Sequence, residues 1–201
     1  MEEISYMNQT VPIIVQCSGC GAKNRIPDSK IGESAKCGKC GLPLKTAPDP
    51  SQKGQVFNLR CTSCGAKNRI PADRASGAVR CGKCKAPLDT GVLSNGRPVM
   101  VSDGNFEQTV LRSPLPVLVY CWSANCPTCR MTGPMIDQFA VESKGRVRVG
   151  KVNVEANPNF AARYNVLGVP FLFIFDNGQL KESLPGAIPK HDLMLKMARY
   201  I

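Results

Sequence analysis

The sequence contains few aromatic residues: phenylalanine, tryptophan and tyrosine together make up 6% of its 201 positions. Aromatic side chains contribute much of the area buried in a protein core, so their scarcity indicates that part of the chain is held together by other means. Histidine is scarcer still, because His191 is the only one. It lies near the start of a predicted helix, and we interpret it as a solvated surface residue rather than a catalyst or metal ligand.

Long hydrophobic runs are absent as well. No stretch approaches the ~18 consecutive apolar residues of a membrane-spanning helix, and we expect no contact with a membrane. The chain begins with acidic Glu2 and Glu3, and its first apolar run, at residues 11–15, is too short for a secretory signal peptide. We therefore expect a reducing, cytoplasmic compartment, in which unpaired thiols persist.

Acidic residues are outnumbered, with 15 Asp and Glu against 26 Lys and Arg, and the formal net charge is +11. This charge changes if eight cysteines of the N-terminal half bind two zinc ions as thiolates. Each such centre then carries −2, and the net charge falls to +7. The basic composition is for this reason weak evidence for a nucleic-acid partner, which we do not expect.

Cysteine, by contrast, is abundant, and ten of the eleven cysteines form Cys-x-x-Cys pairs. Four pairs lie in a repeat with a period of 44 residues, in which residues 17–44 align without a gap on residues 61–88 and 15 of 28 positions are identical. Each copy reads C-x2-C-x16-C-x2-C, and two such turns supply the four soft donors of a tetrahedral zinc site. The sequence predicts one Zn²⁺ in each copy, with the ligands Cys17, Cys20, Cys37 and Cys40 in the first and Cys61, Cys64, Cys81 and Cys84 in the second.

Two features of the copies support a metal-dependent fold. Glycine follows the second cysteine in three of the four turns (Gly21, Gly41 and Gly65), where it allows a left-handed backbone; Lys85 takes this place in the fourth. Each copy also has few large apolar residues, so metal binding is expected to supply most of the folding free energy. The alternatives are four reversible dithiols or disulfides, or an iron centre with cysteine ligands.

The organisation of the chain follows from the repeat and from a change in composition near residue 99, beyond which cysteines become sparse and apolar residues recur periodically. Polar and turn-rich segments at 45–55 and 89–98 separate the parts. We predict zinc ribbons over 1–48 and 49–92 and a third domain over 93–201. In that domain, hydrophobic periodicity predicts the element order β-α-β-α-β-α-β-β-α. The fold class is α/β, with a central sheet covered by helices on both faces. The predicted strands are 97–102, 115–122, 146–155 and a hairpin over 170–186. The predicted helices are 103–113, which we expect to begin with an Asp or Asn cap, 126–145, 157–166 and 189–201.

The fifth pair, Cys126 and Cys129, differs from the metal-binding turns. Pro127 removes a backbone N–H, Arg130 follows the second cysteine in place of glycine, and no further pair remains to complete a site. The pair lies where a buried strand gives way to a helix, whose free N–H groups and dipole stabilise a thiolate. We therefore predict that Cys126 is the nucleophile and that Cys129, one turn further along, resolves the mixed disulfide.

At this point the sequence resembles the thioredoxin family over residues 99–201. The segment "VLVYCWSANCPTCR" is similar to the family's strand–Trp–Cys-x-x-Cys signature, and "GVPFLFIFDNGQL" is similar to its second signature. The resemblance implies a thioredoxin fold with a mixed sheet, a redox-active disulfide between Cys126 and Cys129, and a cis bond before Pro170 that faces the dithiol. It also implies site roles for Trp122 and Lys151. The tandem ribbons resemble the single N-terminal ribbon of bacterial thioredoxins of the thioredoxin-2 type, here duplicated.

Several positions depart from the family's pattern. The active-site dipeptide is Pro127-Thr128 instead of Gly-Pro, and Asn125 precedes the first cysteine in place of tryptophan. Tyr120 replaces the family's buried aspartate, and Cys121 stands where phenylalanine is usual. These departures bear on the redox potential, the rate and the choice of substrates. We interpret Cys121 as a core residue rather than a third redox partner.

The resemblance implies a protein-disulfide reductase. Its partners are then protein disulfides, whose chain pairs with the backbone before Pro170 like an added strand, and a thioredoxin reductase or similar electron donor. One alternative retains the fold without the activity. Another is a binding module whose ribbons recruit a protein or nucleic acid, and a third is an oxidation sensor in which zinc release controls activity.

Overall fold

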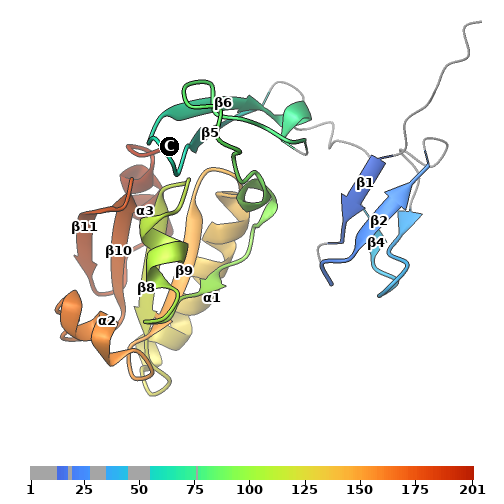
Figure 1. The fold of residues 1–201 in the computed structure, drawn as a ribbon. Helices are drawn as coiled ribbons and strands as arrows, with labels where there is room; N and C mark the ends of the chain where they lie inside the picture. The colour runs from blue at the N-terminus through green and yellow to red at the C-terminus, as the bar shows by residue number, and fades with distance from the viewer. Residues whose placement is uncertain (1–12, 18–19, 28–34, 45–54, 76) are drawn as a thin grey trace, which may run out of the picture. The chain divides into compact units, whose positions relative to one another are not determined.

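The computed structural model describes residues 13–17, 20–27, 35–44, 55–75 and 77–201 (Figure 1). By their internal contacts, the residues divide into two compact units, Met1–Lys53 and Gly54–Ile201. The first unit contains the first cysteine repeat. The second contains the second repeat together with the C-terminal domain, so the two copies of the repeat have different structural surroundings.

The described part of the first unit consists of two short antiparallel ribbons. Strand β1 (Ile13–Gln16) pairs with β2 (Lys23–Ile26), and β3 (Ala35–Lys36) pairs with β4 (Pro43–Leu44). Its small hydrophobic cluster is built on four buried residues, of which two are cysteines: Cys17, Ile26, Cys37 and Leu44. A core of this size is too small to stabilise a fold by burial alone, which agrees with the expectation of a metal-dependent fold.

The second repeat forms a larger structure. Strand β5 (Val56–Arg60) pairs with β6 (Lys67–Pro71), which leads into the short helix η3 (Ala72–Arg74), and a second short helix, η4 (Gly91–Ser94), follows the repeat. Its hydrophobic cluster includes two buried residues from outside the predicted ribbon 49–92, Leu93 and Leu115, which are both almost fully buried. The second ribbon thus shares a core with the beginning of the C-terminal domain.

Polar and steric contacts of β5 complete this junction. The Arg60 guanidinium donates to both carboxylate oxygens of Asp176, at 2.8 and 3.4 Å, and the Arg60 backbone N–H donates to the Pro114 carbonyl at 2.9 Å. Phe57 packs so closely on Gly145 that a Cβ at this glycine would lie 2.5 Å from the phenyl ring. Gly145 also has a φ of +75°, so two constraints favour glycine there.

The C-terminal domain is built on a five-stranded mixed sheet in the order β11-β10-β8-β9-β7. Figure 1 shows β11, β10, β8 and β9 side by side. The parallel part comprises β7, β9 and β8, whereas β10 runs antiparallel to both β8 and β11. Strands β10 and β11 turn at Asn177-Gly178, both with positive φ, which confirms the predicted hairpin. The strands are β7 (Val99–Met100), β8 (Val117–Trp122), β9 (Arg148–Asn153), β10 (Phe171–Asp176) and β11 (Gln179–Pro185).

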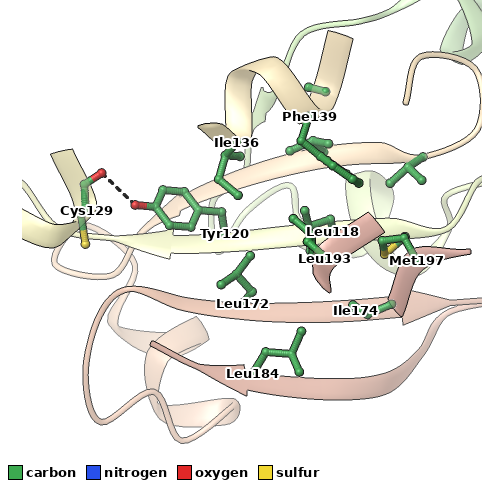
Figure 2. Packing of buried hydrophobic residues seen from close by; sticks show 13 residues of the cluster. Leu118, Tyr120, Cys129, Ile136, Phe139, Leu172, Ile174, Leu184, Leu193 and Met197 are labelled. Carbon is green, nitrogen blue, oxygen red and sulfur yellow. Dashed lines mark hydrogen bonds between the residues drawn. The ribbon is translucent and has the colours of Figure 1, made fainter. Parts of the chain in front are cut away.

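Side chains alternate along β8 and contribute to a separate core on each face of the sheet. Leu118 and Tyr120 pack under α1 (Pro127–Glu142) and α3 (Lys190–Met197) in the cluster that Figure 2 shows. Val117, Val119 and Cys121 pack on the other face, beside Phe160 of α2 (Pro158–Arg163). Cys121 is fully buried there, which confirms it as a core residue, and burial raises the pKa of its thiol to about 12.

The predicted helix at 103–113 differs in detail from the expectation of an Asp or Asn cap. The structure has a π-helix, η5 (Glu107–Leu111), without a side-chain cap. The carboxylate of Asp103 instead accepts hydrogen bonds from the backbone N–H groups of Asn159 and Phe160, at 3.2 and 2.8 Å, in the first turn of α2. A residue expected to cap its own helix therefore caps a helix more than 50 residues away.

The remaining helices agree more closely with the expectation. Helix α2 begins at Pro158, in the first-turn position that proline favours. His191 lies exposed in the first turn of α3, as expected. Within the residues that the structure describes, no helix combines the length and the apolar character needed to cross a bilayer.

Candidate functional site

The fifth cysteine pair lies at the N-terminus of α1. Cys126 is the N-cap, Pro127 is the first helical residue, and the Cys129 backbone N–H donates to the Cys126 sulfur at 3.0 Å. The two sulfurs form a disulfide, with their Cα atoms 5.2 Å apart. Cys126 is half-buried, whereas only 5% of Cys129 is exposed. A partner molecule therefore reaches the sulfur of Cys126 more readily than that of Cys129.

A second segment faces the outer sulfur. The Val169–Pro170 peptide bond is cis, as the resemblance implied, and the Val169 carbonyl oxygen lies 3.6 Å from the Cys126 sulfur. In the reduced state the Cys126 thiol is placed to donate to this oxygen. Pro170 is buried, and its carbonyl accepts a hydrogen bond from Gly186 N–H at 3.0 Å, which holds the loop against the end of β11.

Trp122, at the end of β8, packs against the same hydrophobic cluster as Cys126. Its indole nitrogen Nε1 is buried, and no group among the described residues accepts a hydrogen bond from it. The structure thus brings Trp122, Pro170 and both cysteines of the pair together at one end of the sheet, where β8 ends and α1 begins.

The inner cysteine has a neighbour whose role the sequence did not indicate. The Tyr120 hydroxyl donates to the Cys129 carbonyl oxygen at 3.0 Å, as Figure 2 shows by a dashed line. Burial raises the pKa of this hydroxyl to about 12. The side chain that replaces the family's buried aspartate is therefore a neutral hydrogen-bond donor throughout the physiological pH range.

Lys151 lies on β9 directly opposite Tyr120, but its charge is paired elsewhere. Its Nζ contacts the Asp137 carboxylate of α1 at 2.6 Å. Asp137 was not among the predicted site residues. The sequence carries no specific signal for it, because eight positions along a helix place Asp137 about 80° around the axis from Cys129, and its ion partner lies on a separate strand. Lys151 therefore reaches the site as half of an ion pair.

The other eight predicted site residues form two clusters of four sulfurs. In each cluster all four sulfurs lie within 4.8 Å of one another, and none of the eight cysteines is in a disulfide. Close approaches across the turns are 3.5 Å for Cys17–Cys40, 3.6 Å for Cys20–Cys37, 3.5 Å for Cys61–Cys84 and 3.7 Å for Cys64–Cys81. A tetrahedron of Zn–S bonds of about 2.3 Å places its sulfurs about 3.8 Å apart, so both clusters fit the ion.

The backbone conformation of each turn explains why glycine is favoured directly after its second cysteine. Gly21, Gly41 and Gly65 have φ values of 71°, 71° and 72°, and Lys85 adopts the same conformation at 62°. In all four turns this residue's N–H donates to the carbonyl of the first cysteine. The third cysteine of each set receives hydrogen bonds from N–H groups of its own turn. In the first set, those from Cys40 and Lys39 lower the pKa of the Cys37 thiol to about 6. Such a sulfur is readily available as a thiolate ligand.

Comparison with known proteins matches both parts of the chain. The thioredoxin family profile matches residues 97–199, and the profile described as "Thioredoxin 2, N-terminal" matches residues 16–42 and again 60–86. A thioredoxin from Synechocystis sp. is 41% identical over 101 residues, which are 50% of this chain and 94% of that protein. A chloroplastic M-type thioredoxin from Pisum sativum is 38% identical over 102 residues, 51% of this chain and 59% of that protein. The two matched ribbon segments together contain all eight clustered cysteines, four in each segment.

Proposed function

The chain belongs to the thioredoxin family of thiol–disulfide oxidoreductases, and on that premise we propose that Cys126 and Cys129 reduce disulfide bonds in protein substrates. The observation that carries this proposal is the position of the Cys126 sulfur. It is partly exposed, accepts a hydrogen bond from Cys129 N–H at the start of α1, and lies beside the Val169 carbonyl. The helix N-terminus stabilises a thiolate at this position.

The reaction then proceeds in two exchanges. The Cys126 thiolate attacks one sulfur of the substrate disulfide and forms a mixed disulfide, and the other substrate sulfur leaves as a thiolate that takes up a proton. The Cys129 thiol loses its proton and attacks the Cys126 sulfur, which releases the second substrate thiol. Two electrons have passed to the substrate, and the chain is left with the Cys126–Cys129 disulfide. A thioredoxin reductase or a similar dithiol donor returns the electrons.

The surroundings of the dithiol suggest how a substrate is held. The backbone at Val169, next to buried Pro170, is placed beside the reactive sulfur, and we propose that an extended substrate segment pairs with it like an added strand. Trp122 packs against the same hydrophobic cluster as Cys126, and we expect it to shape this region. Lys151 is expected to influence the dithiol only together with Asp137, because the two charges compensate one another.

The proposal is tested by insulin reduction with a thioredoxin reductase and by trapping of the intermediate. Cys126→Ser should reduce activity to background, whereas Cys129→Ser should accumulate a mixed disulfide with the substrate. Cys121→Ala is the matched control, because Cys121 is buried on the opposite face of β8 and should leave activity in place. Insulin reduction by Cys126→Ser at the wild-type rate would remove the proposal.

For the ribbons we propose one Zn²⁺ in each four-cysteine cluster, with a structural role. Four thiolates leave no open coordination position, so the ion would hold the fold of the ribbon and take no part in the exchange reaction. Elemental analysis should give two zinc ions per chain and little iron. Fewer than two, or a dominant iron content, would contradict this assignment. We keep the domain boundaries 1–48, 49–92 and 93–201 as part of the same proposal.

Oxidation sensing is a second candidate role for the ribbons, and the exposure of ligands in both clusters favours it. Cys40 in the first cluster, and Cys64 and Cys84 in the second, are exposed, so an oxidant in solvent can reach them. Release of zinc during treatment with micromolar peroxide, followed with a colorimetric chelator, is the expected result for a sensor. Unchanged zinc content under these conditions would leave only the structural role.

A further inference from the structure

Each ribbon contains an asparagine whose side chain spans its two cysteine turns. In the second ribbon, Asn68 Nδ2 donates to the Ala66 carbonyl at 2.9 Å, and Asn68 Oδ1 accepts from Gly82 N–H at 2.9 Å. Ala66 follows the first turn, and Gly82 lies inside the second turn, between Cys81 and Cys84. One amide group thus joins two turns that are separated by more than a dozen residues in the sequence.

The first ribbon repeats this arrangement with its own residues. Asn24 Nδ2 donates to the Ala22 carbonyl at 2.9 Å, and Asn24 Oδ1 accepts from Gly38 N–H at 3.0 Å. The two ribbons differ elsewhere: among the described residues, the cluster of the second ribbon includes Leu93 and Leu115, whereas that of the first ribbon is built on residues of the ribbon itself. The same contacts in both surroundings indicate that they belong to the cysteine turns rather than to the junction with the rest of the protein.

The hydrogen bonds connect directly to the metal-ligand backbone. The carbonyl that accepts from each asparagine also accepts from the first ligand's N–H: Cys17 N donates to Ala22 O and Cys61 N to Ala66 O, both at 2.9 Å. A continuous path therefore runs from the first cysteine, through the carbonyl and the asparagine, to the residue after the third cysteine. In the first ribbon the Asn24 amide nitrogen lies in addition 3.6 Å from the Cys37 sulfur.

The side chains of both asparagines are positioned by strand alternation. Asn24 and Asn68 are half-buried, whereas the lysine before and the arginine after each of them are exposed. An amide that turns inward in this way exchanges part of its contact with water for hydrogen bonds to its protein partners. Among residues of this strand, the asparagine is thus the one whose polar group faces the cysteine turns.

We propose that Asn24 and Asn68 are positioning residues of the two metal centres. Each fixes the distance between the two turns, so that four sulfurs meet at the spacing that zinc requires, and each resists the separation of the turns through which the ion leaves. The proposal rests on the zinc centres proposed above. Groups that orient metal ligands in this indirect way typically change metal affinity by about 10–100-fold.

The test measures zinc loss from the full-length, zinc-loaded chain to a chromophoric chelator. Asn68→Asp keeps the acceptor for Gly82 N–H but loses the donor to Ala66, and Asn68→Ala loses both. One of the two zinc ions should therefore leave faster, by about 10-fold or more, in the order wild type, Asn68→Asp, Asn68→Ala. Asn24→Asp should accelerate the release of the other ion, and the double variant should accelerate both.

Arg69→Ala is the matched control, because Arg69 is the exposed neighbour of Asn68 on β6 and should leave both release rates unchanged. If Asn68→Ala is isolated with a single zinc ion, Asn68→Asp carries the comparison. As a second readout, Co²⁺ loaded in place of zinc should show altered ligand-field absorption in the Asn68 variants at equal metal content, which general loss of stability would not produce.

Two outcomes would contradict the proposal, and they can be distinguished from one another. Wild-type protein with fewer than two zinc ions would overturn the metal centres, and the positioning role with them. Wild-type protein with two ions, together with Asn68→Asp and Asn24→Asp release rates within about twofold of wild type, would overturn the positioning role alone.

Discussion

Tyr120 determines the immediate environment of the inner cysteine. Its hydroxyl donates to the Cys129 carbonyl, and burial raises its pKa to about 12, above the ordinary value of 10.0. Because the folded-state pKa is raised, the neutral form is the one that folding favours. This contribution to stability is complete below about pH 10 and is lost only as the pH rises towards 12. The phenol therefore does not accept the Cys129 proton at neutral pH.

The Tyr120→Phe variant isolates this hydrogen bond. We expect the free energy of unfolding to fall by about 1 kcal/mol, because one buried hydrogen bond is lost while the ring still fills its place. The pH dependence of insulin reduction should keep its shape between about pH 6 and 9, since the lost group does not titrate there. Urea denaturation and initial rates measure the two effects. A change in the pH profile would show that Tyr120 takes part in proton transfer.

Lys85 is the residue that distinguishes one cysteine turn from the other three. It holds a φ of 62° where the other three turns have glycine. A left-handed conformation costs a non-glycine residue about 1–2 kcal/mol. Glycine avoids this cost, but it loses more conformational freedom on folding, which offsets part of the gain. Lys85→Gly should therefore stabilise the zinc-loaded protein by about 0.5–1 kcal/mol in thermal unfolding. Lys83→Gly, in the same turn but without a positive φ, should be destabilising instead.

At the scale of elements, β5 distinguishes the two copies of the repeat. Positions 44 residues apart carry Val15 and Leu59, and Gln16 and Arg60. Leu59 is fully buried, and Arg60 bonds to Asp176 at the end of β10. The first copy carries no positive charge at the position equivalent to Arg60. Two of the differences between the ribbons thus lie on the strand that joins the second ribbon to the C-terminal domain.

Arg60→Gln, which introduces the residue of the first copy, tests this junction. Removal of the guanidinium leaves the largely buried Asp176 carboxylate without its partner, and we expect a loss of about 1–3 kcal/mol in the free energy of unfolding. Arg112→Gln is the control, because its pair with Glu107 is exposed and should contribute less than about 1 kcal/mol. Fluorescence of Trp122, the only tryptophan, follows the unfolding. Equal effects of both variants would contradict a specific junction.

At the scale of the whole molecule, the two proposed zinc ions should have unequal consequences. The second ribbon shares Leu93 and Leu115 with the base of the C-terminal domain, whereas the first ribbon belongs to a separate compact unit. Loss of metal from the second ribbon should therefore expose part of that shared core. Loss of metal from the first should remain local.

Cys81→Ser and Cys37→Ser remove equivalent ligands from the two ribbons and allow a direct comparison. We expect Cys81→Ser to destabilise the C-terminal domain by about 1–3 kcal/mol, the cost of exposing one large apolar side chain, and Cys37→Ser to leave it unchanged. The melting temperature reported by Trp122 fluorescence measures this difference. Equal shifts in the two variants, or a shift in Cys37→Ser alone, would overturn the expected inequality.

Features that depend on near neighbours in the chain were predictable from the sequence. The spacing of the cysteines indicated two four-sulfur sets, Asn177-Gly178 indicated the hairpin, and Pro127 after Cys126 indicated where α1 begins. Each follows from local conformational preferences or from ligand geometry, which a short stretch of sequence expresses in full. The cis bond before Pro170 was predictable only through the resemblance to a family.

Contacts between distant segments were decided by the tertiary structure alone. Asp103 caps α2 instead of its own helix, Lys151 pairs with Asp137, and Arg60 pairs with Asp176. The sequence by itself determined the kinds of chemistry that this protein contains, because those depend on residue type and spacing. Which charges and hydrogen bonds surround the dithiol, and which ribbon joins the C-terminal domain, depended on how the sheet brings remote residues together, and no local pattern encodes that.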